Sequence, residues 1–146
     1  MKKIVFLIFA ALMIFNADAN AKKQPVPYVY MFGFAASFTD TIVHFTAIQQ
    51  VDSAWIESKN NFLQERQAYS YQLRDYLNQK QQLPHRTCMV FYSQKREKLE
   101  KKYQKMLKLY TKSKDGLQHF DVRYLDTQQF KFRTVSAEVT EQTEEK

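Results

Sequence analysis

The sequence predicts an α+β protein built as a two-layer sandwich, with helices on one face of a small mixed sheet. Residues 28–34, 41–46 and 87–93 are runs of aromatic and β-branched side chains, which are typical of strands. Residues 53–79 and 94–114 place apolar side chains at helical spacing. The predicted order is β-β-α-β-α-β(-β), with a right-handed crossover through the second helix.

The first twenty-one residues have the three regions of a secretory signal peptide. Two lysines precede an apolar run from Ile4 to Phe15, and cleavage is predicted after Ala19 or Ala21. The run has twelve residues, fewer than the ~20 that a helix needs to cross a bilayer. We therefore expect an exported chain, periplasmic or in the cell envelope, that is soluble after cleavage and has no transmembrane segment. An uncleaved N-terminal anchor is the alternative.

Four regions follow from this interpretation. Residues 1–21 are the signal peptide, and residues 22–27, with two prolines, are an extended linker. Residues 28–135 are long enough for one domain with one core. Residues 136–146 form an acidic tail that we expect to be disordered, with four glutamates against one lysine.

The first strand, residues 28–34, is apolar on both faces. Aromatic side chains stand at positions 28, 30, 32 and 34, while Val29 and Met31 have the other parity. Such a strand is covered on both faces or central in its sheet. A turn over residues 37–40 then leads to the strand 41–46, which predicts a hairpin over residues 28–46.

The first helix is predicted from Ser53 to about Gln79, with Asp52 or Ser53 as its cap and Pro84 beyond its end. At 1.5 Å per residue this helix is ~40 Å long, which is too long for so small a domain to cover. We therefore expect a bend or break near residues 60–61 or 68–70.

The second helix lies in a segment with nine basic and two acidic residues between Gln94 and Lys114. A turn of 100° per residue places Tyr103 and Tyr110 on the same arc as Leu99, so the tyrosines are assigned to the core. The candidate binding residues for an anion are the five lysines of the opposite arc, namely Lys101, Lys102, Lys105, Lys108 and Lys112.

Two alternating segments close the domain. Residues 119–125 and 130–135 alternate apolar and polar side chains, and residues 126–129 are a possible turn between them. They predict either a closing hairpin or one bulged strand.

The residues that support most cofactor and metal chemistry are few. Gly33 and Gly116 are the only glycines, so no phosphate-binding loop or dinucleotide fingerprint is present and no cofactor is expected. Cys88 is the only cysteine, which excludes an internal disulfide. We expect a buried, inert thiol, and pairing between molecules stays open.

No catalytic or metal-binding residue is assigned. The three histidines, at positions 44, 85 and 119, have no spacing typical of a metal site. His44 lies four residues after Asp40, and in a strand their Cα atoms stand ~13 Å apart, too far for a direct hydrogen bond. The alternative is a small exported hydrolase that combines His44 or His85 with carboxylates distant in the sequence.

The basic helix on its own is compatible with nucleic-acid binding, but its phase and the predicted export argue against this partner. The leading hypothesis is a non-enzymatic interaction or accessory module that binds an envelope protein or an anionic envelope surface through its lysines. An ordinary solvated helix face is the simplest alternative. A chaperone-like holdase is a further alternative, which requires an exposed apolar cavity.

Residues 28–56, 69–77 and 86–103 give the chain a family resemblance. It resembles small exported proteins of unknown function found in Gram-negative gut anaerobes. The resemblance implies a location in the periplasm or envelope, and it brings no activity or catalytic residue with it.

Overall fold

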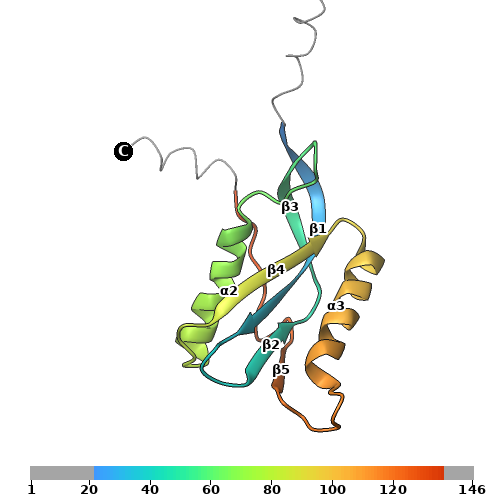
Figure 1. Ribbon diagram of the computed structural model, residues 1–146. Helices are drawn as coiled ribbons and strands as arrows, with labels where there is room; N and C mark the ends of the chain where they lie inside the picture. Colours follow the sequence, from blue (N-terminus) through green and yellow to red (C-terminus); the bar gives the residue numbers. More distant parts are fainter. Residues whose placement is uncertain (1–21, 137–146) are drawn as a thin grey trace, which may run out of the picture.

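The computed structural model describes residues 22–136. The predicted α+β class and the mixed sheet are confirmed, and the order is β-β-β-α-β-α-β, with a third strand before the first helix and a single strand after the second. Residues 1–21, predicted to be a signal peptide, and the part of the predicted tail beyond Ser136 lie outside the described residues. Neither helix within residues 22–136 is both long and apolar enough to cross a membrane. The elements (Figure 1) are β1 (Lys23–Ala36), β2 (Ile42–Thr46), β3 (Gln49–Glu57), α2 (Arg66–Lys80), β4 (Thr87–Ser93), α3 (Arg96–Thr111) and β5 (Asp121–Leu125).

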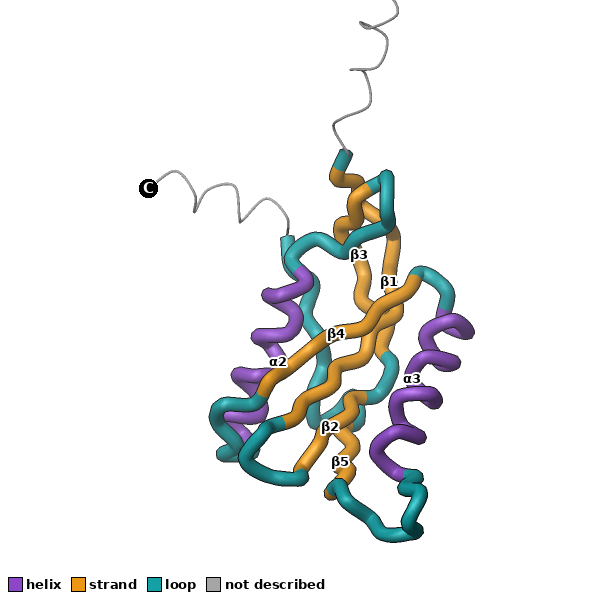
Figure 2. The backbone as a smooth tube through the Cα atoms, viewed as in Figure 1, coloured by secondary structure: helices purple, strands orange, loops and turns teal. Residues whose placement is uncertain are grey.

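β1 is the strand around which the sheet is built (Figure 2). β4 pairs antiparallel with one edge of β1, while β2 and β3 follow one another along the other edge. Phe34 pairs with Phe45 and Met31 with Gln49, so two intervening residues of β1 face three of the opposite chain. This extra residue is a β-bulge, which separates β2 from β3. β5 then adds to β2 in parallel.

The two helices pack on opposite faces of the sheet, so the prediction that both cover one face is wrong (Figure 1). Successive side chains of β1 point to opposite faces. Met31 and Ala35 belong to the core cluster that contains the α2 side chains, whereas Phe32 and Phe34 belong to the cluster under α3. The double-sided apolar character of β1 therefore reflects a strand covered on both faces.

The direction of the two crossovers explains this arrangement. β3 and β4 are both antiparallel to β1 and lie on its two edges, so the connection through α2 crosses the sheet in one direction. The connection from β4 through α3 to β5 crosses back. Crossovers between parallel strands share one hand, and two crossovers of one hand in opposite directions place their helices on opposite faces.

The predicted helix over residues 53–79 is wrong in its first half. Trp55 and Ile56 belong to β3, which pairs with the first half of β1 from Lys23 onward. Residues 23–27, expected to be a linker, are therefore part of the sheet. The expected break near residues 60–61 is present: the chain turns there, with a positive φ of 55° at Asn61, and α2 then buries Tyr69, Leu73 and Leu77.

The remaining elements follow the prediction closely. β2 and β4 occupy residues 42–46 and 87–93, and α3 lies within the basic segment. Tyr103 packs with its ring centroid 4.9 Å from that of Phe32, and Tyr110 lies 5.0 Å from Phe34. The assignment of both tyrosines to the core is confirmed.

Residues 130–135, which we call the C-terminal strap, form no strand with β5 or any other described element, so the predicted closing hairpin or bulged strand is wrong. Two glutamine side chains take the place of a neighbouring strand. The Gln49 amide donates to the Phe130 carbonyl (3.0 Å) and accepts from the Phe132 N–H (2.9 Å). Gln72 of α2 bonds the N–H and the carbonyl of Arg133 in the same manner, at 2.8 Å each.

Replacing Gln49 by alanine is expected to destabilise the fold by about 2–4 kcal/mol, because the Phe130 carbonyl and the Phe132 N–H lose their partner in a buried position. The matched change Gln72→Ala breaks the same kind of contact at an exposed site, where water replaces it, and is expected to cost under about 1 kcal/mol. Urea unfolding of both variants measures the difference. Equal losses would show that burial of the Gln49 contact is unimportant.

At Gly33, side chains of α2 and of the C-terminal strap lie close against β1. A Cβ at this position would lie 2.7 Å from Leu73 Cδ2 and 3.2 Å from Phe132 Cζ. We expect Gly33→Ala to destabilise the protein by about 1–3 kcal/mol through overpacking. Thermal unfolding of Gly33→Ala, Leu73→Ala and the double variant checks the mechanism. Since Leu73→Ala removes the clashing atom, the double variant should be more stable than the sum of the single changes predicts.

Candidate functional site

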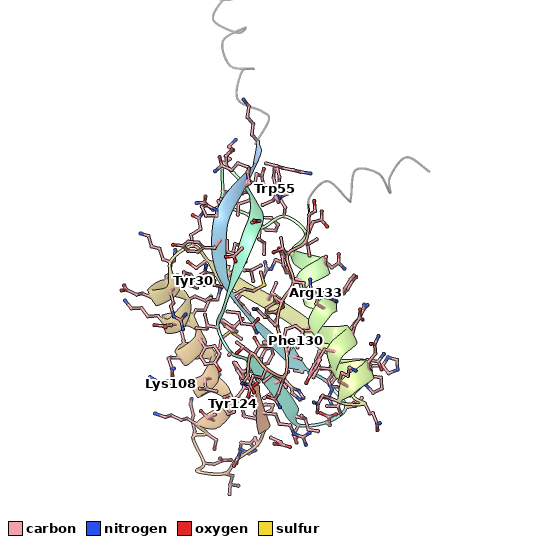
Figure 3. All side chains as sticks on the ribbon, turned by 180° about the vertical axis from the view of Figure 1, so that it is seen from behind. Tyr30, Trp55, Lys108, Tyr124, Phe130 and Arg133 are labelled. Atoms are coloured by element: carbon pink, nitrogen blue, oxygen red, sulfur yellow. The ribbon has the colours of Figure 1, made fainter. Side chains whose placement is uncertain are left out.

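The five candidate lysines are all exposed; four lie on α3, and Lys112 directly follows its last residue. Figure 3 shows Lys108 projecting from the helix away from the sheet. Within residues 22–136, none of the α3 lysines forms an ion pair. Exposure on the arc opposite the core is therefore confirmed, while their role in binding stays a prediction.

Lys102 differs from the other four because it leans over the sheet. Its Nζ lies 4.7 Å from the centre of the Phe91 ring, which belongs to β4. A cation above an aromatic face is stabilised by the charge distribution of the ring. This contact directs the ammonium group toward the end of β4, where further cations gather.

These cations surround a cavity of about 550 Å³ between the start of α3, the end of β4 and the start of α2, which we call the basic groove. Asn60, Asn61, Ser93 and Gln94 add amide and hydroxyl groups to its wall. Among the described residues that line it, no aspartate or glutamate occurs. The basic residues of the groove are Arg66, Lys95, Lys98 and Lys102.

The basic groove combines two elements far apart in the sequence. Arg66 is the first residue of α2, and its Nη2 and Nε atoms donate to the Val90 carbonyl of β4 at 3.0 and 3.3 Å. Lys95 and Lys98 come from the first turn of α3 and the residue before it. β4 lies between the two helices in sequence and in space, so it brings both helix starts to one place.

The charges around α3 are distributed unevenly. Glu97 and Glu100 lie on the flank of the helix away from the basic groove, and Arg96 Nε pairs with Glu100 Oε1 at 2.9 Å. Both glutamates line another cavity together with Lys101 and Lys105. The acidic residues of α3 thus offset cations on one flank, and the groove on the other flank keeps an uncompensated positive charge that attracts anions.

His44 is buried between strands and does not form a catalytic pair. Burial lowers its pKa to about 4, and the nearby charges of Arg123 and Arg86 contribute in the same direction, against Asp121 and Asp40. Its Nδ1 atom has no hydrogen-bond partner among the described residues. A neutral imidazole without a carboxylate partner at Nδ1 lacks the orienting group of a hydrolase site.

The charged groups beside His44 are committed to each other. Arg86 is 6% exposed, and its Nη1 donates to Asp40 Oδ1 at 2.7 Å and to the Ile42 carbonyl at 3.0 Å. The Arg86 bond holds the pKa of the Asp40 carboxyl below its usual value. His85, the other candidate of the hydrolase hypothesis, is exposed in a loop with a φ of 61°. The hydrolase hypothesis therefore gains no support.

Cys88 is a free, partly buried cysteine in β4. Desolvation raises the pKa of its thiol to about 11. Because the thiolate is the reactive form, a thiol protonated at neutral pH is a poor nucleophile. This agrees with the expected inert thiol, although the side chain is less deeply buried than expected.

Within the described part of the chain, no group of three or more histidine, cysteine, aspartate or glutamate side chains is arranged to hold a metal ion. No known protein family, curated protein or solved structure matches the chain. A function for the candidate site is therefore inferred from its own residues and geometry.

Sequence reasoning identified Lys102 but missed the other three basic residues of the groove. Lys95, Lys98 and Lys102 are three and four residues apart, so they lie on the same flank of the helix. This spacing is visible in the sequence, but the prediction separated only the core arc from the opposite arc. Arg66 had no such signal, because its predicted place was inside a long helix and its neighbour is a strand more than twenty residues away.

Stability is expected to fall between pH 6.5 and 4 because of His44. The folded imidazole has a pKa of about 4 and the unfolded one about 6.5, so the unfolded chain binds the extra proton over this range. The loss amounts to roughly 3 kcal/mol at most. Urea unfolding at pH 7.5 and 4.5 should show a smaller loss for His44→Leu than for the unchanged protein. An identical loss would mean that His44 is not the group responsible.

Proposed function

We propose that the protein is a non-enzymatic interaction module that binds an acidic partner protein through the basic groove and the neighbouring lysines of α3. The observation that supports this most directly is the meeting of Arg66, Lys95, Lys98 and Lys102 around one cavity whose described lining has no carboxylate. Like charges held close together destabilise a surface, and an anionic ligand relieves this repulsion.

The shape of the site favours a protein segment over a membrane. Lys98 and Lys102 on α3 face Arg66 on α2 across the end of β4, so the cations surround a recess rather than lie on a plane. A flat layer of lipid headgroups reaches outward-pointing lysines such as Lys108 more readily than groups at the sides of a groove. A narrow acidic chain reaches both walls at once.

The phase of α3 disfavours sequence-specific binding of nucleic acid. Tyr103 and Tyr110 are packed against the rings of β1, so neither is free to stack on a base. The predicted export of the chain, which depends on residues 1–21, adds to this argument. We propose the periplasm or cell envelope as the location and an acidic envelope protein as the partner.

Direct titration with labelled poly-glutamate tests the proposal. Fluorescence anisotropy at low salt is expected to show binding that weakens as salt is added, because exposed charges are screened. The triple change Lys95→Glu, Lys98→Glu and Lys102→Glu is expected to lower the affinity about 100-fold, since each lost ion pair in a partly shielded site contributes ~1 kcal/mol.

The matched control reverses three lysines further along the chain, Lys105→Glu and Lys108→Glu on α3 and Lys112→Glu directly after it, with an equal change in net charge. This variant should lose much less affinity than the groove variant. If both variants lost the same affinity, net charge alone would explain the effect, and the groove would not be the binding site. Tighter binding to vesicles with anionic lipid than to poly-glutamate would contradict a protein partner.

A further inference from the structure

β4 has an edge with no strand partner among residues 22–136. It pairs with β1 from Thr87, opposite Ala36, to Ser93, opposite Tyr30, and with no other described strand. In Figure 2 it lies at the front of the sheet with α2 and α3 to its sides. The unpaired main-chain groups of such an edge are a template for a further strand.

The main-chain groups at the centre of this edge point outward. The Gly33 N–H donates to Thr46 Oγ1 at 2.8 Å, on the side of β1 away from β4. Val90, which is opposite Gly33, therefore turns its own N–H and carbonyl away from β1, and the carbonyl accepts from Arg66. Because alternate residues share a direction, the main-chain groups of Cys88 and Tyr92 face outward as well.

Two other edges of the sheet, those of β1 and β5, contain residues that discourage pairing, whereas β4 does not. The part of β1 beyond the end of β4 includes Pro25 and Pro27. The edge strand β5 includes the ion pair of Asp121 and Arg123. Prolines and charges are the usual protection of an edge. β4 reads TCMVFYS, with neither, so its protection among the described residues comes from Arg66 of α2.

Two cavities of different chemistry lie beside the open edge. The cavity near Cys88 and Val90 is lined by three of the exposed large apolar side chains, Phe62, Tyr71 and Met89. The cavity near Ser93 is the basic groove. Arg66 lines both cavities and so stands between them.

We propose that the open edge of β4 receives an extended segment of the acidic partner as an added β-strand. The segment is about seven residues long, the length of β4, with carboxylates in the basic groove and apolar side chains against Phe62, Tyr71 and Met89. The acidic character of this segment rests on the proposed function, whereas its binding as a strand is inferred from the unpaired edge of β4.

Arg66 makes the edge selective for an acidic strand. Its guanidinium occupies the Val90 carbonyl, which an incoming main-chain N–H would need. A carboxylate of the partner draws the guanidinium away from the carbonyl, because a bidentate pair with a carboxylate is stronger than a bond to a neutral oxygen. A neutral strand offers no such exchange.

A second copy of the chain is a less suitable occupant. Val90 is the middle residue of Thr87–Ser93, so antiparallel pairing of two β4 edges would bring two Arg66 guanidinium groups together. Their repulsion disfavours a symmetric dimer through this edge.

The test uses the full chain and a fluorescein-labelled peptide with three glutamates and a run of alternating valine and threonine, measured by anisotropy. Two further peptides carry backbone N-methyl groups at alternate residues of the run, one set on each side of the strand. Strand addition uses the N–H groups of one side only. One methylated peptide should therefore bind at least tenfold more weakly than the parent, while the other binds as the parent does.

The outcomes separate the two proposals. Equal binding of both methylated peptides would overturn strand addition, even if the triple groove variant had a lower affinity for poly-glutamate than the unchanged protein. Failure of the parent peptide to bind, with poly-glutamate binding intact, would overturn it as well. Self-association of the protein that the peptide competes with would assign the edge to a second copy instead. If the unchanged protein bound the parent peptide but not poly-glutamate, the proposed function would be contradicted. The comparison of the two methylated peptides would then still decide whether a strand is added.

The variant Arg66→Met tests the selectivity. It frees the Val90 carbonyl, so a neutral peptide with glutamine in place of glutamate should bind several-fold more tightly to the variant than to the unchanged protein. The preference for the acidic over the neutral peptide should shrink accordingly. An unchanged preference in a variant with an unaltered circular dichroism spectrum would contradict the role of Arg66.

Discussion

β1 is buried on both faces and paired on both edges, and this determines where every other element lies. Val29, Met31 and Ala35 belong to the cluster that contains the α2 side chains, and Phe32 and Phe34 belong to the cluster under α3. A strand with two apolar faces requires a cover on each, so a single layer of helices cannot satisfy it. Gly33 extends the same constraint, because the absence of a side chain lets Leu73 and the C-terminal strap approach the sheet.

The same arrangement creates the candidate site. Two crossovers in opposite directions bring the starts of α2 and α3 to the end of the one strand that they share, β4. Arg66 and the first lysines of α3 thereby meet around a cavity, although neither helix has a distinctive motif. The glutamates of α3 lie on its other flank, so the positive charge is concentrated where the strand edge is open.

The C-terminal strap shows why a polar residue can decide the course of a chain. Gln49 and Gln72 each present an amide that bonds one N–H and one carbonyl, which is the pattern a neighbouring strand offers. Glutamine in a sequence is typical of a surface, so neither position indicated a structural role. The alternation of residues 130–135 predicted a strand, which is wrong, because the partner of this segment is a pair of side chains and not a neighbouring strand.

The sequence by itself determined the α+β class, the limits of β2 and β4, and the orientation of α3, because these depend on periodicities of two and 3.6 residues within one segment. It also determined that the tyrosines of α3 face the core and the lysines face outward. Tertiary structure decided that residues 49–57 are a strand, because Val51, Trp55 and Ile56 fit a helical spacing equally well until the first half of β1 offers them a partner. It likewise decided that the helices lie on opposite faces and that Arg66 joins the lysines, since both depend on contacts between segments far apart in the chain, which local periodicity does not encode.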